Sequence, residues 1–98
     1  MEFEWDDNKA ASNLQKQGVT FPEAATAFAD PLAAIFPDPD HSADEEREIL
    51  VGFSERGRLL VVSFTERPPN LRIISARVAS LAERRNHEEN PMRGWSHE

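Results

Sequence analysis

Residues 47–65 read REILVGFSERGRLLVVSFT, and the side chains of this stretch alternate with the two-residue period of a β-strand. Residues 54–57 interrupt the alternation and end in Gly57, a residue that accepts the positive φ of a tight turn. Residues 58–65 then return as a second strand rich in Leu and Val. The stretch predicts an antiparallel hairpin. We expect Arg47, Ile49, Val51 and Phe53 on one face of its first strand and Leu50 and Gly52 on the other.

Further strands flank this hairpin. Pro68-Pro69-Asn70 predicts a turn, followed by a third long strand over residues 71–77. The apolar residues 32–36 predict a short strand, residues 37–46 a polar loop, and residues 3–5 an edge strand. In the third long strand we expect Leu71, Ile73, Ser75 and Arg77 on one face and Arg72, Ile74 and Ala76 on the other.

Three helices are predicted from their end signals. The first starts after Asp6 or Asp7 as N-cap and runs to Gln17, with Gly18 ending it. The second covers about residues 21–29 and the third residues 80–89. Each of these two begins with a capping box, in which a hydroxyl and a Glu three residues later satisfy the first amides of the helix. The boxes are Thr20 with Glu23 and Ser80 with Glu83.

The predicted order is β-α-α-β-β-β-β-α. This order indicates an α+β fold in which the two N-terminal helices and the C-terminal helix pack on one face of a mostly antiparallel sheet. A chain of 98 residues supports one hydrophobic core. We therefore expect a single domain over residues 1–89 and a C-terminal tail over residues 90–98, where Trp95 is an aromatic suited to docking.

The composition excludes several classes of protein. There is no cysteine, which removes disulfides, thiolate nucleophiles and cysteine-based zinc sites. No apolar run approaches the roughly 20 residues of a membrane span. The acidic start, MEFEWDD, lacks the basic and apolar regions of a secretory signal. We expect a cytoplasmic protein.

The net charge of −7 is divided unevenly. Residues 1–48 hold 12 acidic and 3 basic side chains, whereas residues 56–85 hold 7 arginines against Glu66 and Glu83. A guanidinium grips phosphate through a planar fork and keeps its charge. The arginine-rich stretch therefore favours an anionic partner, although any single arginine there can equally be a solvated flank of a strand or helix.

Several separated motifs resemble the BrnT-type toxins, in order and with compatible spacing over about residues 3–89. In the N-terminal half the matching positions are Phe3-Glu4-Trp5-Asp6, Lys9, Asn13, Lys16, Gly18-Val19, Phe21, Glu23-Ala24, Phe28 and Asp30-Pro31. In the C-terminal half they are Gly57-Arg58-Leu59-Leu60-Val61-Val62, Thr65-Glu66-Arg67, Arg72-Ile73-Ile74-Ser75-Ala76-Arg77 and Glu83-Arg84-Arg85.

The resemblance implies a RelE-like fold and a ribonuclease that arrests translation as the toxin of a type II toxin-antitoxin system. It also implies a BrnA-type antitoxin as partner, with DNA bound only through that antitoxin. No cofactor is implied. Gln17, Val78 and His87 stand where the family more often has His, Lys and Tyr. These departures leave open an alternative, a weakened toxin that acts as a binding module in antitoxin-mediated regulation.

RNA cleavage without a metal needs a base for the 2′-hydroxyl proton, an acid for the 5′-oxygen, and cations for the charge that develops on the phosphate oxygens. We assign the cationic role to Arg77 and Arg84. His87 is the candidate for proton transfer, because histidine changes charge near neutral pH and lies three residues after Arg84 on the predicted helix. The alternative is an exposed histidine without a role.

The remaining candidates are RNA contacts, namely Arg67, Arg72, Arg85 and Lys16. A metal site is not expected. The acidic residues between Asp38 and Glu46 lack the spacing and the glycine of an EF-hand, so we expect them in a solvated loop.

Overall fold

The computed structural model describes residues 2–38 and 46–89. The predicted tail with Trp95, and residues 39–45 of the predicted acidic loop, lie outside the described residues. The elements are β1 (Glu2–Glu4), α1 (Asp7–Gln17), α2 (Phe21–Thr26), a 3₁₀ turn η1 (Ala27–Ala29), β2 (Ala34–Pro37), β3 (Glu48–Phe53), β4 (Leu59–Arg67), β5 (Asn70–Val78) and α3 (Leu81–Glu89).

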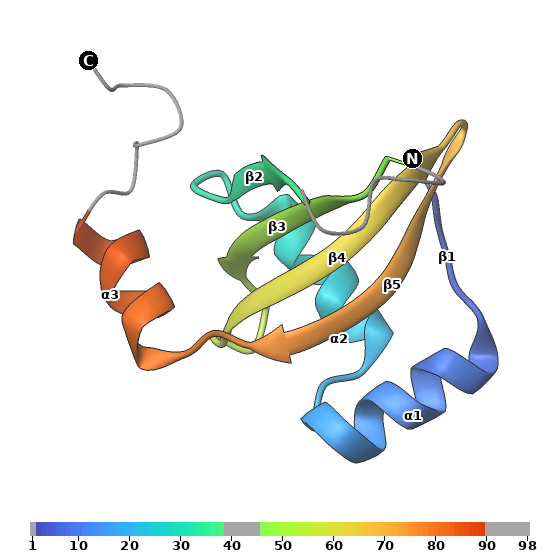
Figure 1. Ribbon diagram of the computed structural model, residues 1–98, viewed down its shortest axis with the longest axis horizontal. Helices are drawn as coiled ribbons and strands as arrows, with labels where there is room; N and C mark the ends of the chain where they lie inside the picture. Colours follow the sequence, from blue (N-terminus) through green and yellow to red (C-terminus); the bar gives the residue numbers. More distant parts are fainter. Residues whose placement is uncertain (1, 39–45, 90–98) are drawn as a thin grey trace.

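The strands form one five-stranded sheet in the order β1-β5-β4-β3-β2 (Figure 1). The β3–β4 hairpin is confirmed, with Ile49 opposite Ser63 and Gly57 at φ 80° in the turn. All neighbours are antiparallel except β1 and β5. The α+β class and the mostly antiparallel sheet are therefore as predicted. The predicted second helix is shorter, because its last turn tightens into η1.

A bulge in β5 breaks the alternation expected there. Ile73 lies opposite Phe64 and Ser75 lies opposite Ser63, so Ile74 is an extra residue in β5 without a direct partner. One inserted residue reverses which face the following side chains occupy. The strict two-residue pattern predicted for residues 71–77 is wrong at this point.

The bulge divides the side chains of β5 between the hydrophobic core and the opposite face of the sheet. Leu71, Ile73 and Ala76 are all buried in the hydrophobic core. Ser75 and Arg77 lie opposite Ser63 and Val61 on the other face. The predicted common face of Leu71 and Arg77 does not exist, and Arg77 is free of the core.

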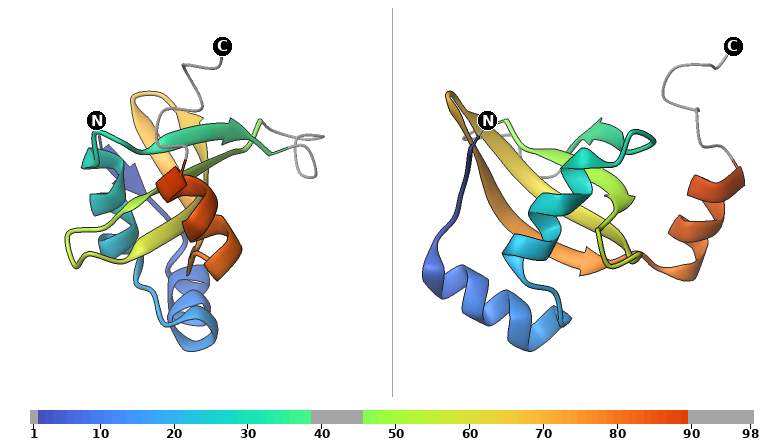
Figure 2. Two further views of the ribbon diagram at one scale, coloured as in Figure 1. Left: turned by 90° about the vertical axis from the view of Figure 1, so that its left-hand side faces the viewer. Right: turned by 180° about the vertical axis from the view of Figure 1, so that it is seen from behind.

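The core lies between the sheet and the α2–η1 segment, which crosses the sheet when the molecule is seen from behind (Figure 2). Phe28 packs against Phe64 with ring centroids 5.0 Å apart. Gly52 is required beneath this segment, since a Cβ there would lie 2.9 Å from the Cβ of Ala33 and 3.1 Å from the carbonyl oxygen of Ala27. The close approach of η1 to β3 thus depends on a missing side chain.

Helix α1 lies beside the edge of β5 and is attached there by Asn13. Strand β1 covers this edge only as far as Arg72. Beyond it, the buried Asn13 amide donates to the carbonyl oxygen of Ala76 at 2.8 Å and accepts from the amide of Ala76 at 3.1 Å. The same amide nitrogen donates to the carbonyl oxygen of Val19 at 2.9 Å. Asn13 therefore substitutes for a neighbouring strand next to Arg77.

Replacing Asn13 with alanine should destabilise the protein by about 2–3 kcal/mol, because the Ala76 amide and carbonyl would be left without partners at a buried edge. Urea unfolding followed by circular dichroism measures this change. Asn8→Ala, on an exposed position of the same helix, is the control and should cost under about 0.5 kcal/mol. Equal midpoints for the two variants would contradict the role given to Asn13.

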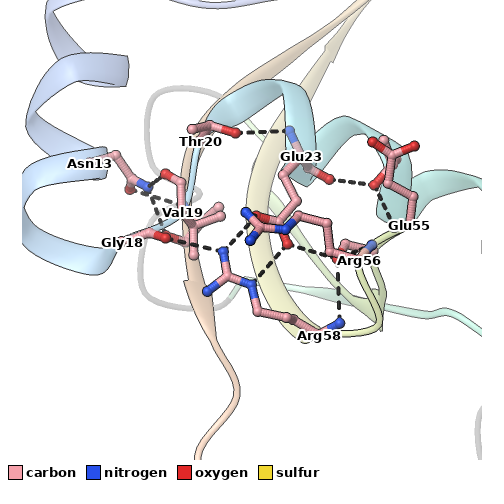
Figure 3. A network of polar contacts seen from close by, with 11 residues as sticks. Asn13, Gly18, Val19, Thr20, Glu23, Glu55, Arg56 and Arg58 are labelled. Atoms are coloured by element: carbon pink, nitrogen blue, oxygen red, sulfur yellow. Dashed lines mark hydrogen bonds and ion pairs between the residues drawn. The ribbon is translucent and has the colours of Figure 1, made fainter.

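Figure 3 shows a polar network behind the hairpin turn, centred on Glu23. The predicted capping box is half formed: Thr20 Oγ1 accepts from the amide of Glu23, but the Glu23 carboxylate turns away from the helix end. It accepts from Arg58 Nε at 2.9 Å and from Ser54 Oγ at 2.8 Å. Arg58 also donates to the carbonyl oxygen of Gly18 at 3.1 Å. This network joins the hairpin to α1 and α2.

Helix α3 differs from the expected arrangement. It extends beyond the end of β5 (Figure 1), rather than covering the core with α2. Its contacts are with the opposite face of the sheet, where His87 meets the ring of Phe53 at 6.0 Å between centroids. Its capping box is complete, since Ser80 Oγ accepts from the Glu83 amide and the Glu83 carboxylate accepts from the Ser80 amide. No helix within residues 2–38 and 46–89 is long and apolar enough to cross a membrane.

Candidate functional site

The face of the sheet turned away from α2, called the open face below, carries two adjoining hollows. The first has a volume of about 310 Å³ and lies between α1, β5 and the start of β3. Its polar lining consists of Asn13, Gln17, Asp38, Arg47, Ser63, Ser75 and Arg77. The second, of about 300 Å³, lies between the sheet and α3. It is lined by Ala34, Phe36, Ile49, Val51, Val61, Arg77, Glu83, Asn86 and His87.

A third, smaller hollow of about 210 Å³ continues the first along α1. It shares Asn13, Gln17 and Ile74 with the first and adds Lys9 and Lys16. We call the three hollows together the groove. From α1 to α3, the groove runs across the bulged part of β5. The bulge therefore sets the site, because it turns Arg77 onto the open face.

Arg77 lines both the first and the second hollow. Its two terminal nitrogens each donate to Glu83, at 2.8 Å to Oε1 and 2.8 Å to Oε2. These bonds raise the pKa of the Arg77 guanidinium and lower the pKa of the Glu83 carboxyl to about 2. A guanidinium has five N–H groups, so this fork leaves donors on Arg77 available. Glu83 thus fixes the orientation of Arg77 and still leaves N–H groups of the guanidinium able to donate to a ligand.

Arg84 and His87 meet at Phe53. The guanidinium carbon of Arg84 lies 5.7 Å from the centre of the Phe53 ring, a cation–π distance, and His87 packs on the same ring. Arg84 also pairs with Glu88, Nε to Oε2 at 3.2 Å. His87 is the buried residue of α3 and lines the second hollow. The reading of His87 as an exposed side chain is therefore wrong.

The structure brings some predicted residues together and separates others. Arg77 and His87 share the second hollow, and Lys16 lines the third hollow. Arg84 lines none of the three hollows and lies over the Phe53 ring that His87 also contacts. Arg47 lines the first hollow with Arg77. Sequence reasoning missed Arg47, although its place at the start of the strand that carries Ile49 and Val51 was the available signal.

Three predicted RNA contacts lie away from the groove lining. Arg72 is at the other end of β5, where its Nη1 donates to Glu4 at 2.9 Å. Arg67 lies next to the β4–β5 turn, opposite Asn70. Arg85 is exposed on α3 and has no ion pair within the part of the chain that the structure describes. The arginine-rich stretch is therefore spread over the molecule, and part of it, notably Arg58, is structural.

The acidic side chains of the site have structural partners of their own. Glu83 holds Arg77 and caps α3. Its low pKa keeps it ionised at neutral pH and makes it a weak proton acceptor. Among residues 2–38 and 46–89 there is no cluster of three or more His, Asp or Glu side chains able to hold a metal ion.

The comparison with known proteins gives a consistent result. A family model described as the ribonuclease toxin BrnT of a type II toxin-antitoxin system matches residues 5–83. The 1.1 Å crystal structure of the Brucella abortus ribonuclease toxin BrnT superposes with a TM-score of 0.65 at 28% sequence identity, covering 82% of this chain and 97% of that chain. No curated protein matches.

The family match includes the bulged strand, Arg77 and the Glu83 that orients it, and it ends just before Arg84 and His87. It names a ribonuclease toxin, which favours an enzyme over the alternative of an inactive binding module. The chain belongs to the BrnT family, the ribonuclease toxins of type II toxin-antitoxin systems.

Proposed function

We propose that this protein cleaves RNA in the groove, and that Arg77 binds the phosphate whose bond to the 5′-oxygen is cleaved. The observation that carries this assignment is the position of Arg77, which lines both the first and the second hollow and is oriented by two hydrogen bonds to Glu83. A fixed guanidinium that needs no rearrangement is the kind of group that stabilises charge developing on phosphate oxygens. We further propose that the fold is RelE-like, with residues 1–89 as the toxin domain and residues 90–98 as a tail.

The groove supports a path for the RNA backbone. Arg47 and Arg77 line the first hollow, and Lys9 and Lys16 line the third. Cations spaced along a groove neutralise successive phosphates and make binding dependent on salt. Arg84 and Arg85 on α3 would meet the strand where it leaves the second hollow. Arg67 and Arg72 would contact only RNA that extends around the far end of the sheet.

His87 is the candidate for proton transfer. The 2′-oxygen attacks the adjacent phosphorus as it loses its proton, the bond from phosphorus to the 5′-oxygen breaks, and that oxygen takes up a proton. His87 lies in the same hollow as Arg77, and we assign one of these two proton transfers to its imidazole. The mechanism we propose uses no metal and no cofactor.

The partner and the cellular location are proposed from the assignment to a type II toxin family. A type II toxin has an antitoxin, and we propose a BrnA-type protein that covers the groove and binds DNA, so that the toxin meets DNA only through it. We propose that the pair acts in the cytoplasm.

Purified protein incubated with total RNA tests the proposal. We expect His87→Ala to lower the cleavage rate about 100-fold, within the range of lost acid–base catalysis. Because His87 is buried against Phe53, thermal unfolding must show that the variant is folded at the assay temperature. The pH dependence of the residual rate should flatten. Intact RNA in the presence of wild-type protein that binds its antitoxin tightly would support the binding-module alternative instead.

A further inference from the structure

We propose that the second hollow is a subsite for a nucleobase, the one carried by the nucleotide next to the phosphate at Arg77. This inference rests on the proposed function and adds to it a place where RNA sequence is read. The floor and walls are apolar, formed by Ala34, Phe36, Ile49, Val51 and Val61 from three neighbouring strands. Such a surface receives the flat face of a base that has left its stack.

The rim of the hollow supplies the polar groups that a base requires. Asn86 is exposed on α3 and lines the hollow, so its amide offers one acceptor and two donor hydrogens. That combination matches the edge of a base, which presents donors and acceptors side by side. His87 closes the same side of the hollow. The walls would thus bind any base, and the rim would select among bases.

Continuity with the first hollow identifies the occupant as RNA. Arg77, Ile49 and Val61 line both hollows. A phosphate at Arg77 therefore places the attached ribose at the border and its base in the second hollow. An apolar side chain of the antitoxin is the competing occupant, because it would use the same walls. Such a side chain would leave the polar groups around the hollow unused, among them the phosphate-binding guanidinium of Arg77.

Val51 lines the second hollow and neither of the others, so Val51→Phe should fill this subsite alone. Val78→Phe is the matched control, because Val78 is 43% exposed at the end of β5 and lines none of the three hollows. Asn86→Ala, on the exposed rim, is a second test variant that should fold whatever the effect of Val51→Phe. Circular dichroism verifies each fold.

Binding is measured by fluorescence anisotropy with 2′-O-methyl RNA hexamers, which have no 2′-hydroxyl proton to lose and stay intact. One abasic position is moved along the hexamer. For the wild type and Val78→Phe, we expect one position at which loss of the base weakens binding on the order of tenfold, typical of a lost base contact. For Val51→Phe the abasic and the intact hexamer should bind with about equal affinity, because the intact hexamer already lacks the base contact in this variant. Asn86→Ala should reduce the difference in affinity among the four bases at that position.

The same abasic penalty in wild type, Val51→Phe and Val78→Phe would overturn the subsite while leaving the groove as the RNA site. Val51→Phe that weakens antitoxin binding and leaves every hexamer unaffected would overturn it in favour of the protein occupant. Wild-type protein that binds no hexamer would overturn the proposed function itself. If Val51→Phe does not fold, Asn86→Ala decides: unchanged preference among the four bases overturns the proposal.

Discussion

Arg77→Ala is expected to lower the rate of RNA cleavage by a factor on the order of 10²–10³, the range seen when one preorganised donor to a developing negative charge is removed. Expression of the variant should no longer arrest growth. Stability should change little, because the Arg77–Glu83 pair is 44% and 39% exposed and exposed ion pairs contribute little. The rate is measured with purified protein on a labelled RNA, and the fold by thermal unfolding.

Arg56→Ala is the matched control, since it removes the same charge from a side chain that is 69% exposed on the hairpin turn, away from the groove. It should cleave at nearly the wild-type rate. Arg77→Lys should recover only part of the activity, because an ammonium keeps the charge but loses the planar fork. An Arg77→Ala protein that is folded and as toxic as wild type would show that the phosphate is held elsewhere.

Glu23→Ala should destabilise the protein by about 2–3 kcal/mol, because it removes the buried acceptor of Ser54 and of Arg58, whose own side chain is 33% exposed and keeps part of its hydration. Glu23 is 5% exposed and accepts from both Arg58 and Ser54. Chemical unfolding in urea measures the loss. Asp7→Ala, an exposed acidic position in the first turn of α1, removes the same charge and should cost less than about 1 kcal/mol. Glu23→Ala within that smaller range would contradict the structural role of the pair.

The same pair predicts a direction for the pH dependence of stability. Hydrogen bonds from Arg58, together with one from Ser54, hold the pKa of Glu23 below its ordinary value of 4.5. The carboxylate therefore stabilises the fold fully above pH 4.5 and loses that contribution as the pH falls through its lowered pKa. Accordingly, the difference in unfolding free energy between wild type and Glu23→Gln should shrink as the pH falls below 4.5. A difference that stays constant down to acid unfolding would contradict this linkage.

Local patterns were sufficient to predict much of the fold. The alternating residues of the hairpin, the Gly57 turn and the Ser80–Glu83 capping box all depend on neighbours in the chain, and all are found as predicted. The start of α1 after Asp6 and its end at Gly18 follow from the same local chemistry. Such features are visible in sequence because their energies arise within one turn or one strand pair.

Features that depend on contacts between distant segments could not be predicted. The bulge at Ile74 depends on how β5 pairs with β4, and nothing in residues 71–77 alone indicates it. Glu23 was expected to cap its own helix, but the guanidinium of Arg58, 35 positions later, binds it instead. A charged partner forms stronger hydrogen bonds than a backbone amide.

The candidate site was predicted in part for the same reason. Arg77 and His87 were identified by residue type and by their closeness in sequence, and they share a hollow. Arg47 joins Arg77 only through the pairing of β3, β4 and β5. Arg67 and Arg72 were grouped with Arg77 by sequence, but strand direction carries them toward the other end of the sheet, since each residue of a strand advances about 3.3 Å.

The proposed function requires RNA to lie in the groove over the bulged half of β5. Amide chemical shifts of the ¹⁵N-labelled wild-type protein, recorded during titration with an uncleavable 2′-O-methyl RNA, test it most directly. We predict the largest shifts at Asn13, Ser63, Ser75, Arg77 and His87. Shifts confined to Glu4, Arg67 and Arg72 at the opposite end of the sheet would contradict the account.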